Sequence, residues 1–163
     1  MPKVQSIVEE VRKESEATSR MLERIPGDKL DWQPHAKSKS IGDLAYHIAA
    51  LPALVANALR RDELDAAAPR PPMPRDVPPA EVFRRNLDEF LSVIGSMDYD
   101  QMMQPFRFHF GEKTLLEGPK AMVVRTLLMN HTYHHRGQLS VYLRLLDVPV
   151  PIVYGNTADE KAF

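Results

Sequence analysis

Four stretches of the chain place apolar residues at every third or fourth position, which is the period of an amphipathic helix. Residues that start or stop helices bound them: Pro26 and Gly27 follow the first stretch, Ser40 and Asp43 begin the second, and Gly95 ends the third. The pattern therefore predicts four long helices, over residues 4–25, 41–58, 79–94 and 119–146.

Each predicted helix has one mainly apolar face, which we expect to lie inward. In chain order these faces consist of Val4, Ile7, Val8, Val11, Thr18, Met21, Leu22 and Ile25; Leu44, His47, Ile48, Leu51, Leu54, Val55 and Leu59; Phe83, Leu87, Phe90, Leu91 and Ile94; and Val124, Leu127, Leu128, His131, His135, Gln138, Leu139, Tyr142 and Leu145.

The segments between the helices differ in character. Residues 66–80 hold six of the fourteen prolines, which predicts an extended crossover connection. Residues 106–110, with the sequence FRFHF, alternate with period two and indicate a short strand or an extended loop. The tail from residue 148 onward, rich in proline, is expected to be irregular. Together these features predict an all-α four-helix bundle, with residues 1–163 forming a single domain.

Composition and charge narrow the possible functions. The net charge is -1, without the basic surplus of a protein that binds nucleic acid or an anionic membrane. The longest apolar run, residues 48–59, is shorter than the roughly 20 residues that cross a bilayer, and the first residues lack the apolar core of a signal peptide. We therefore expect a cytoplasmic protein. Because the chain has no cysteine, its chemistry must rely on histidine, carboxylate and hydroxyl groups.

Three of the six histidines lie on predicted inward faces: His47 in the second helix, and His131 and His135 in the last. The i, i+4 spacing of His131 and His135 stacks two imidazoles on one side of a helix, where both can reach one ion. One such histidine alone is more often a core residue, but a third on another helix favours a metal site. His134 is expected on the flank. Di-iron bundles use E-x-x-H motifs, and the chain contains none.

Two candidates for orienting these ligands lie on the same helices. Asp43 precedes His47 by four residues and is a candidate acceptor for its free N–H, although a role beside Ser40 at the helix start competes with this. Gln138 follows His131 by seven residues and is a candidate for orienting water or substrate; the alternative is a polar residue at the rim of the bundle.

Other candidates concern substrate binding. Arg136 could pair with an anionic substrate or thiol cofactor, or, as is more common for an arginine so placed, with a carboxylate on a neighbouring helix or on a dimer partner. Tyr46 and Tyr133 flank the histidines and are candidates for pocket walls, although packing between helices is the commoner role of such tyrosines. No carboxylate stands out as a general base; Glu112 and Glu117, before the last helix, are the ones to test.

Three segments of the chain resemble the DinB superfamily of DinB/YfiT-like proteins: SIGDLAYHIA, HTYHHRGQLSVYLRLLDVPVP and VYGNTADE. The resemblance implies a four-helix bundle with up-down-down-up connectivity, commonly as a homodimer. It also implies a divalent ion, usually zinc or nickel, held by His47, His131 and His135. Characterised members resemble metal-dependent hydrolases, or transferases and isomerases that use a low-molecular-weight thiol.

The residues and the resemblance together predict a metalloenzyme that acts on a small molecule. An ion held by three histidines keeps an open position and lowers the pKa of bound water, to about 7 for zinc enzymes. It would equally favour the thiolate form of an external thiol. The alternative is a non-catalytic module in which the ion only stabilises the bundle or the dimer, and the protein binds a ligand or a partner, for example in a stress response.

Overall fold

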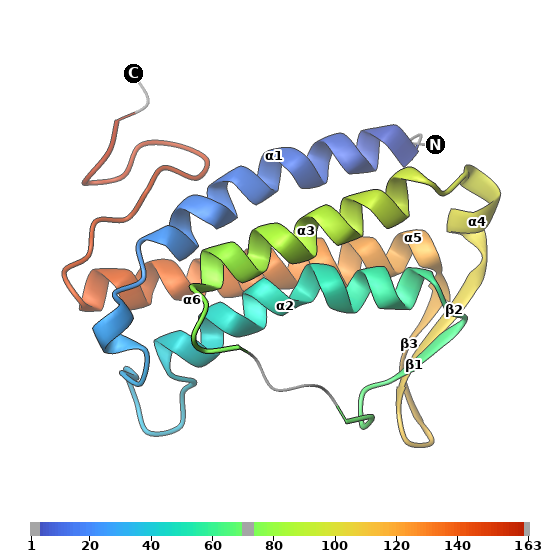
Figure 1. Ribbon diagram of the computed structural model, residues 1–163, viewed down its shortest axis with the longest axis horizontal. Coiled ribbons are helices and arrows are strands. Elements are labelled where there is room, and N and C mark those ends of the chain that lie inside the picture. Colours follow the sequence, from blue (N-terminus) through green and yellow to red (C-terminus); the bar gives the residue numbers. More distant parts are fainter. Residues whose placement is uncertain (1–3, 70–73, 162–163) are drawn as a thin grey trace.

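The computed structural model describes residues 4–69 and 74–161, and most of them lie in helices packed side by side (Figure 1). The long helices are α1 (Val4–Glu23), α2 (Ile41–Leu59) and α3 (Pro79–Gly95). The last long segment runs through α5 (Lys120–Val123), the π-helix η2 (Val124–Asn130) and α6 (His131–Leu145).

The directions of the helices follow from tracing the chain in Figure 1. Helix α1 runs one way, α2 and α3 run the opposite way, and the segment from α5 to α6 returns in the direction of α1. Because α2 and α3 run in the same direction, the chain must travel the length of the bundle between them. Residues 66–80 make this connection, as the proline pattern predicts, although residues 70–73 lie outside the described part.

The start of α2 is set by two local contacts. The side-chain oxygen of Ser40 accepts a hydrogen bond of 3.0 Å from the backbone N–H of Asp43, which caps the helix. The backbone N–H of Gly42 donates to the carbonyl of Leu30 at 2.9 Å. A Cβ at position 42 would lie 2.7 Å from that carbonyl oxygen, so only glycine permits this approach.

The apolar faces of the helices meet in two core clusters. One cluster joins Val55, Phe90 and Ile94 to Val124, and it includes Phe106 of the sheet. The other joins Leu44, Ile48 and Phe83 to Leu139. These residues are nearly or completely buried, as are Val8, Val11, Met21 and Leu22 of α1. Others that were expected to face inward, among them Ile7, Leu54 and Leu87, are half-buried, so the helical period identified most but not all of the core positions of α1, α2 and α3.

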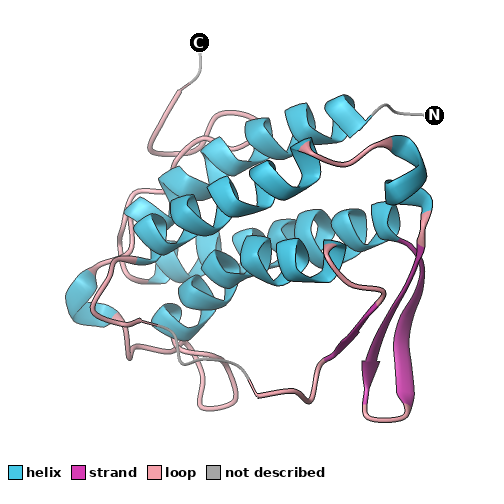
Figure 2. Ribbon diagram, turned by 45° about the vertical axis from the view of Figure 1, so that its right-hand side comes forward, coloured by secondary structure: helices cyan, strands magenta, loops and turns pink. Residues whose placement is uncertain are grey.

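A small sheet at one end of the helices makes the all-α prediction incomplete (Figure 2). Its strands are β1 (Glu63–Asp65), β2 (Pro105–Phe110) and β3 (Lys113–Pro119). Strand β2 lies in the centre, parallel to β1 and antiparallel to β3. The FRFHF pattern thus marks a strand. The three residues of β1 are too few to show alternation, and they become a strand only by pairing with β2.

The last helix also differs from the prediction of one uninterrupted α-helix. In η2 the backbone hydrogen bonds join residues five apart. The buried positions follow that spacing: Val123 and Val124 are followed by Leu128 and Met129. An α-helical period misses Val123 and Met129, because each π turn inserts one extra residue.

The buried face of α6 also includes different residues from those that the helical period predicts. Leu139 and Leu143 are buried, whereas Leu145, which was expected to face inward, is 57% exposed. Gln138 is exposed as well, and Tyr142 is half-buried. The face drawn through 138, 142 and 145 is therefore the flank of the helix.

The described part of the C-terminal tail has no helix or strand, as expected. Side chains hold it against the bundle. Asp159 pairs with Arg144 at 2.5 Å and also accepts the backbone N–H of Val150, and Glu160 pairs with Arg24 at 2.6 Å.

Short helices complete the fold: η1 (Gly27–Lys29) follows α1, and α4 (Tyr99–Met103) follows α3. Among the described helices, only α2 has the length and apolar composition of a membrane-spanning segment, with 19 residues and a mean hydropathy of 1.2. Because 67% of this apolar stretch is buried inside the protein, the position of α2 in the core explains its apolar composition.

Candidate metal centre

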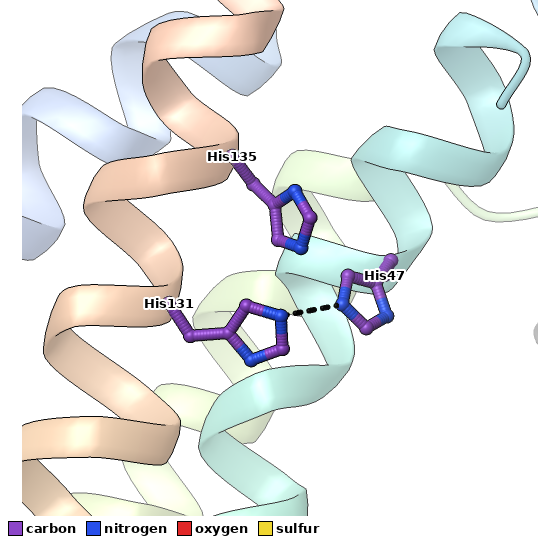
Figure 3. Close-up of side chains that lie close together, drawn as sticks. All are labelled: His47, His131 and His135. Atoms are coloured by element: carbon purple, nitrogen blue, oxygen red, sulfur yellow. Dashed lines mark hydrogen bonds between the residues drawn. The ribbon is translucent and has the colours of Figure 1, made fainter. Parts of the chain in front are cut away.

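Three histidines on two helices converge in the structure (Figure 3). His47 comes from α2, and His131 and His135 come from successive turns of α6. Each ring offers one nitrogen, and these three atoms all lie within 4.8 Å of one another. The Nε2 atoms of His47 and His131 are 3.2 Å apart. The structure therefore brings together the three histidines that the sequence pattern selected.

His135 is held in one orientation by a neighbour on its own helix. Its Nδ1 lies 2.7 Å from Oε1 of Gln138. Because an amide oxygen can only accept, Nδ1 must carry the proton, and the lone pair of the ring resides on Nε2. This Nε2 is buried and has no hydrogen-bond partner among the described residues. Leaving a buried acceptor without a donor costs free energy, and a metal ion bound to this nitrogen would remove that cost.

The environment also favours neutral imidazoles. Burial lowers the pKa of His131, and the neighbouring His135 and His134 lower it further. Burial likewise lowers the pKa of His135, against an opposing effect of the hydrogen bond to Gln138. Neutral imidazole is the form that binds a metal ion, so the site is poised for coordination at neutral pH.

The donor set and its spacing fit a divalent transition metal. Two nitrogens that each lie about 2.05 Å from one tetrahedral zinc ion are about 3.3 Å apart, close to the spacing of the His47 and His131 nitrogens. Imidazole suits zinc, nickel, copper and iron, whereas calcium and magnesium prefer oxygen ligands. The three histidines could thus hold a transition metal and leave coordination positions open.

Asp43 and Tyr46 face the proline-rich connection. The carboxylate of Asp43 is bound by the guanidinium of Arg75, which also reaches Asp31 at 3.2 Å. The hydroxyl of Tyr46 donates to the backbone carbonyls of Arg75 and Val77. Both side chains therefore tie α2 to the segment that leads into α3. Arg75 lies in the segment that the sequence pattern treats only as a connection, so no sequence signal marked it as a partner.

Arg136 is the buried member of a side-chain cluster between α6, α1 and the tail, in which Glu14 is half-buried and Tyr154 is exposed. Its side chain is 4% exposed and donates to the carboxylate of Glu14 at 2.8 Å and to the hydroxyl of Tyr154 at 2.7 Å. Its guanidinium also lies 5.3 Å from the ring centre of Tyr133. Of the two roles weighed for Arg136, the structure has it paired with a carboxylate on a neighbouring helix.

Tyr133 lies half-buried beside this cluster, and burial raises its pKa to about 12. The sequence pattern singled out neither Glu14 nor Tyr154. Glu14 lies three residues after Val11 and four before Thr18, on the apolar side of α1 in the helical period, so a charged residue at that position was a signal that could have marked it. Tyr154 lies in an irregular segment, where no period applies. Only the packing of α6 against α1 and the tail brings these two residues to Arg136.

A pocket of about 400 Å³ adjoins the histidine cluster at His47. One face of α2 forms its floor, from His47 through Ala50 to Asn57. Strand β1, the segment that follows it and α3 supply the remaining described walls, including Asp65, Pro69 and Asn86. No local sequence pattern marked these residues, because they come from separate segments that meet only in the folded chain.

The carboxylates considered as general bases lie in the hairpin. Glu112 occupies the turn between β2 and β3, and Glu117 lies in β3, paired in register with Arg107. Both are exposed, and neither belongs to the described lining of the pocket beside His47.

The fold and the histidine cluster define a mostly helical protein with a three-histidine group that could hold a metal ion. A sequence model of the DinB family matches residues 1–162. The chain belongs to the DinB family.

One protein sequence and two solved structures are similar to most of this chain. The uncharacterized protein YrdA of Bacillus subtilis (strain 168) is 26% identical over 155 residues, which cover 91% of this chain and 86% of YrdA. The crystal structure of a DinB-like protein from Bacillus cereus ATCC 10987 superimposes with a TM-score of 0.73 at 21% identity, covering 93% of this chain and 98% of that one. The DinB-like protein YjoA from Bacillus subtilis gives a TM-score of 0.72 at 18% identity, covering 91% and 97%. These two structures share the fold.

Proposed function

We propose that this protein is a metal-dependent enzyme that acts on a small molecule, with His47, His131 and His135 as the ligands of one zinc or nickel ion. The observation that carries the proposal is the buried Nε2 of His135, which holds a lone pair, has no donor among the described residues, and lies with two further imidazole nitrogens within 4.8 Å. An ion bound there would supply a Lewis acid that activates water or a thiol.

The residues around the cluster have distinct tasks in this proposal. Gln138 fixes the ring of His135 through Nδ1, so that Nε2 stays available. His47 forms part of the wall of the adjacent pocket, so a bound molecule would lie against a ligand of the ion. Hydrolysis and thiol-dependent transfer both fit this arrangement; a thiol would have to be supplied from outside, because the chain has no cysteine. The remaining features proposed are a cytoplasmic location and a homodimer.

Elemental analysis by plasma mass spectrometry tests the metal site. It is run on the untagged protein, on His135→Ala and on His134→Ala, which removes a neighbouring but exposed histidine. About one equivalent of zinc or nickel per chain in the parent and in His134→Ala, but not in His135→Ala, supports the site. Absence of metal from all three, also after addition of zinc or nickel, overturns it.

A second measurement distinguishes a catalytic ion from an ion that is needed only to stabilise the fold. Structural zinc supplies folding energy, so its removal unfolds small domains. Here apolar clusters on both sides of the site hold the helices together. We therefore expect the metal-free protein to keep its helical circular dichroism and its cooperative unfolding. Loss of the helical signal on chelation would favour the non-catalytic module instead.

A further inference from the structure

The pocket beside His47 has a composition that restricts what can enter it. Its floor is one face of α2, where the small side chains of Ala50 and Ala53 leave the hollow open between His47 and Asn57. These two residues are ten positions apart, which corresponds to about 15 Å along a helix. Leucines, alanines and a proline form most of the remaining described lining. A volume of about 400 Å³ suits a small organic molecule with an apolar body.

Two amides, of Asn57 and Asn86, contribute to the polar part of the described lining. The side-chain nitrogen of Asn86 donates one of its two hydrogens to the carbonyl of Ala49 at 2.8 Å, which fixes the amide so that its oxygen can act as an acceptor. The side-chain oxygen of Asn57 accepts from Arg61 at 2.9 Å, which leaves the nitrogen of that amide. Asn86 therefore offers an acceptor and Asn57 a donor.

Asp65 is the only carboxylate in the described lining, and the backbone holds it in place. Its Oδ1 accepts the N–H of Ala67 at 2.9 Å and the N–H of Gly111 at 3.2 Å. These bonds, led by the one from Ala67, lower the pKa of Asp65, so the group is ionised at neutral pH. The ring of His109 lies 3.9 Å from the same oxygen and donates to the carbonyl of Gly111. The side chain of Asp65 is 37% exposed.

Within the described lining there is no lysine or arginine to balance this carboxylate. Arg61 lies outside this described lining and donates to the side-chain oxygen of Asn57. Among the described lining residues an anionic molecule would meet Asp65 without a compensating lysine or arginine, whereas an ammonium or amide N–H would find acceptors in Asp65 and Asn86.

We propose that this pocket selects a cationic or neutral substrate with an apolar body, which places an amine or amide group near Asp65 and its reacting group near His47. This inference rests on the proposed function, because it treats the molecule in the pocket as the substrate of the histidine site. It disfavours anionic thiols as occupants of the pocket and leaves hydrolysis of a neutral or cationic compound as the favoured reaction.

The test uses two probes with the same apolar body, a biphenyl that carries either an aminomethyl or a carboxymethyl group. Their affinities for the metal-free protein are measured by isothermal calorimetry, and binding is located through the side-chain amide NMR signals of Asn57 and Asn86. We expect the ammonium probe to shift both signals and to bind at least about tenfold more tightly than the carboxylate probe. Equal or tighter binding of the carboxylate probe, or shifts confined to other residues, would overturn the proposal.

Variants assign the preference to Asp65. Asp65→Asn removes the charge and keeps an oxygen that can accept from Ala67, so we expect the fold to be retained. We expect it to abolish most of the preference, whereas Asp88→Asn, the same change on α3 outside the lining, leaves it intact. An unchanged preference in Asp65→Asn counts against the proposal.

The two proposals can fail separately. A preference for the ammonium probe in a protein that binds no zinc or nickel would leave the pocket selectivity standing and remove the metal site. A protein that binds zinc or nickel but does not prefer the ammonium probe would support the metal site and overturn the pocket selectivity.

Discussion

The Nδ1 of His135 and the Oε1 of Gln138 lie 2.7 Å apart, one turn of α6 from each other. This contact connects the exposed flank of the helix to its buried face, because Gln138 is exposed whereas His135 is only 8% exposed. It determines which nitrogen of the buried ring carries the proton, and hence which nitrogen is left for an ion.

Replacing Gln138 by alanine is therefore expected to lower the affinity for zinc by about 10–100-fold, because the ring of His135 loses its orientation. Gln138→Glu keeps an acceptor at the same place and should restore most of the affinity. Competition with a chromophoric chelator measures both. Gln104→Ala, an exposed glutamine at the end of α4, is the control. Equal affinities for Gln138→Ala and the parent would show that the contact does not support metal binding.

Removal of Arg136 is expected to destabilise the protein. In Arg136→Ala the carboxylate of Glu14, whose side chain is 18% exposed, loses its buried partner. Breaking a buried ion pair in this way costs about 3–5 kcal/mol. Urea unfolding measures the loss. Arg60→Ala breaks the exposed pair with Glu89 and should cost less than about 1 kcal/mol. Similar losses in the two variants would contradict a stabilising role for the cluster around Arg136.

An added methyl group is expected to have opposite effects on stability at two glycines that lie in helices. Gly42→Ala places a Cβ 2.7 Å from the carbonyl oxygen of Leu30 and is expected to cost about 1–3 kcal/mol. Gly137→Ala, in α6, meets nothing within 4 Å and should add about 0.5–1 kcal/mol. Thermal unfolding measures both, and a loss at position 137 equal to that at 42 would contradict the packing described for α2.

The stability of the metal-free protein is expected to fall as the pH drops below about 6.5. Burial lowers the pKa of His131 and of His135 from 6.5. As the pH falls through 6.5, the unfolded chain therefore binds protons that the folded protein does not yet bind, which favours unfolding. The carboxylates whose pKa is lowered by an arginine partner contribute at lower pH: Glu10, paired with Arg125, near and below 4.5, and Asp159, paired with Arg144, near and below 3.8.

Urea unfolding between about pH 7.5 and pH 5 measures this dependence, and the double variant His131→Asn, His135→Asn is the comparison. We expect a smaller loss of stability in the double variant than in the parent. The same slope in both would mean that other groups govern the loss.

Some elements of the fold could be predicted from the sequence and others could not. The three helices α1, α2 and α3 were predicted to within two residues of their ends, because each has a clear apolar face and stop or start signals at its ends. The histidines were selected for the same reason: their spacing follows the period of an α-helix in α2 and α6. The sheet, the π-helix η2 and the exposure of Leu145 did not follow from that period.

The sequence by itself determined the helical segments and the helix faces that carry His47, His131 and His135, since a helix face depends only on spacing along one segment. Only the tertiary structure decided that these rings meet within 4.8 Å, that Arg136 pairs with Glu14, and that Asp65 of β1 faces the same pocket as His47 and Asn86. Each of these depends on how separate segments pack against one another. Packing is a sum of many small contacts between residues far apart in the chain, and no local pattern records it.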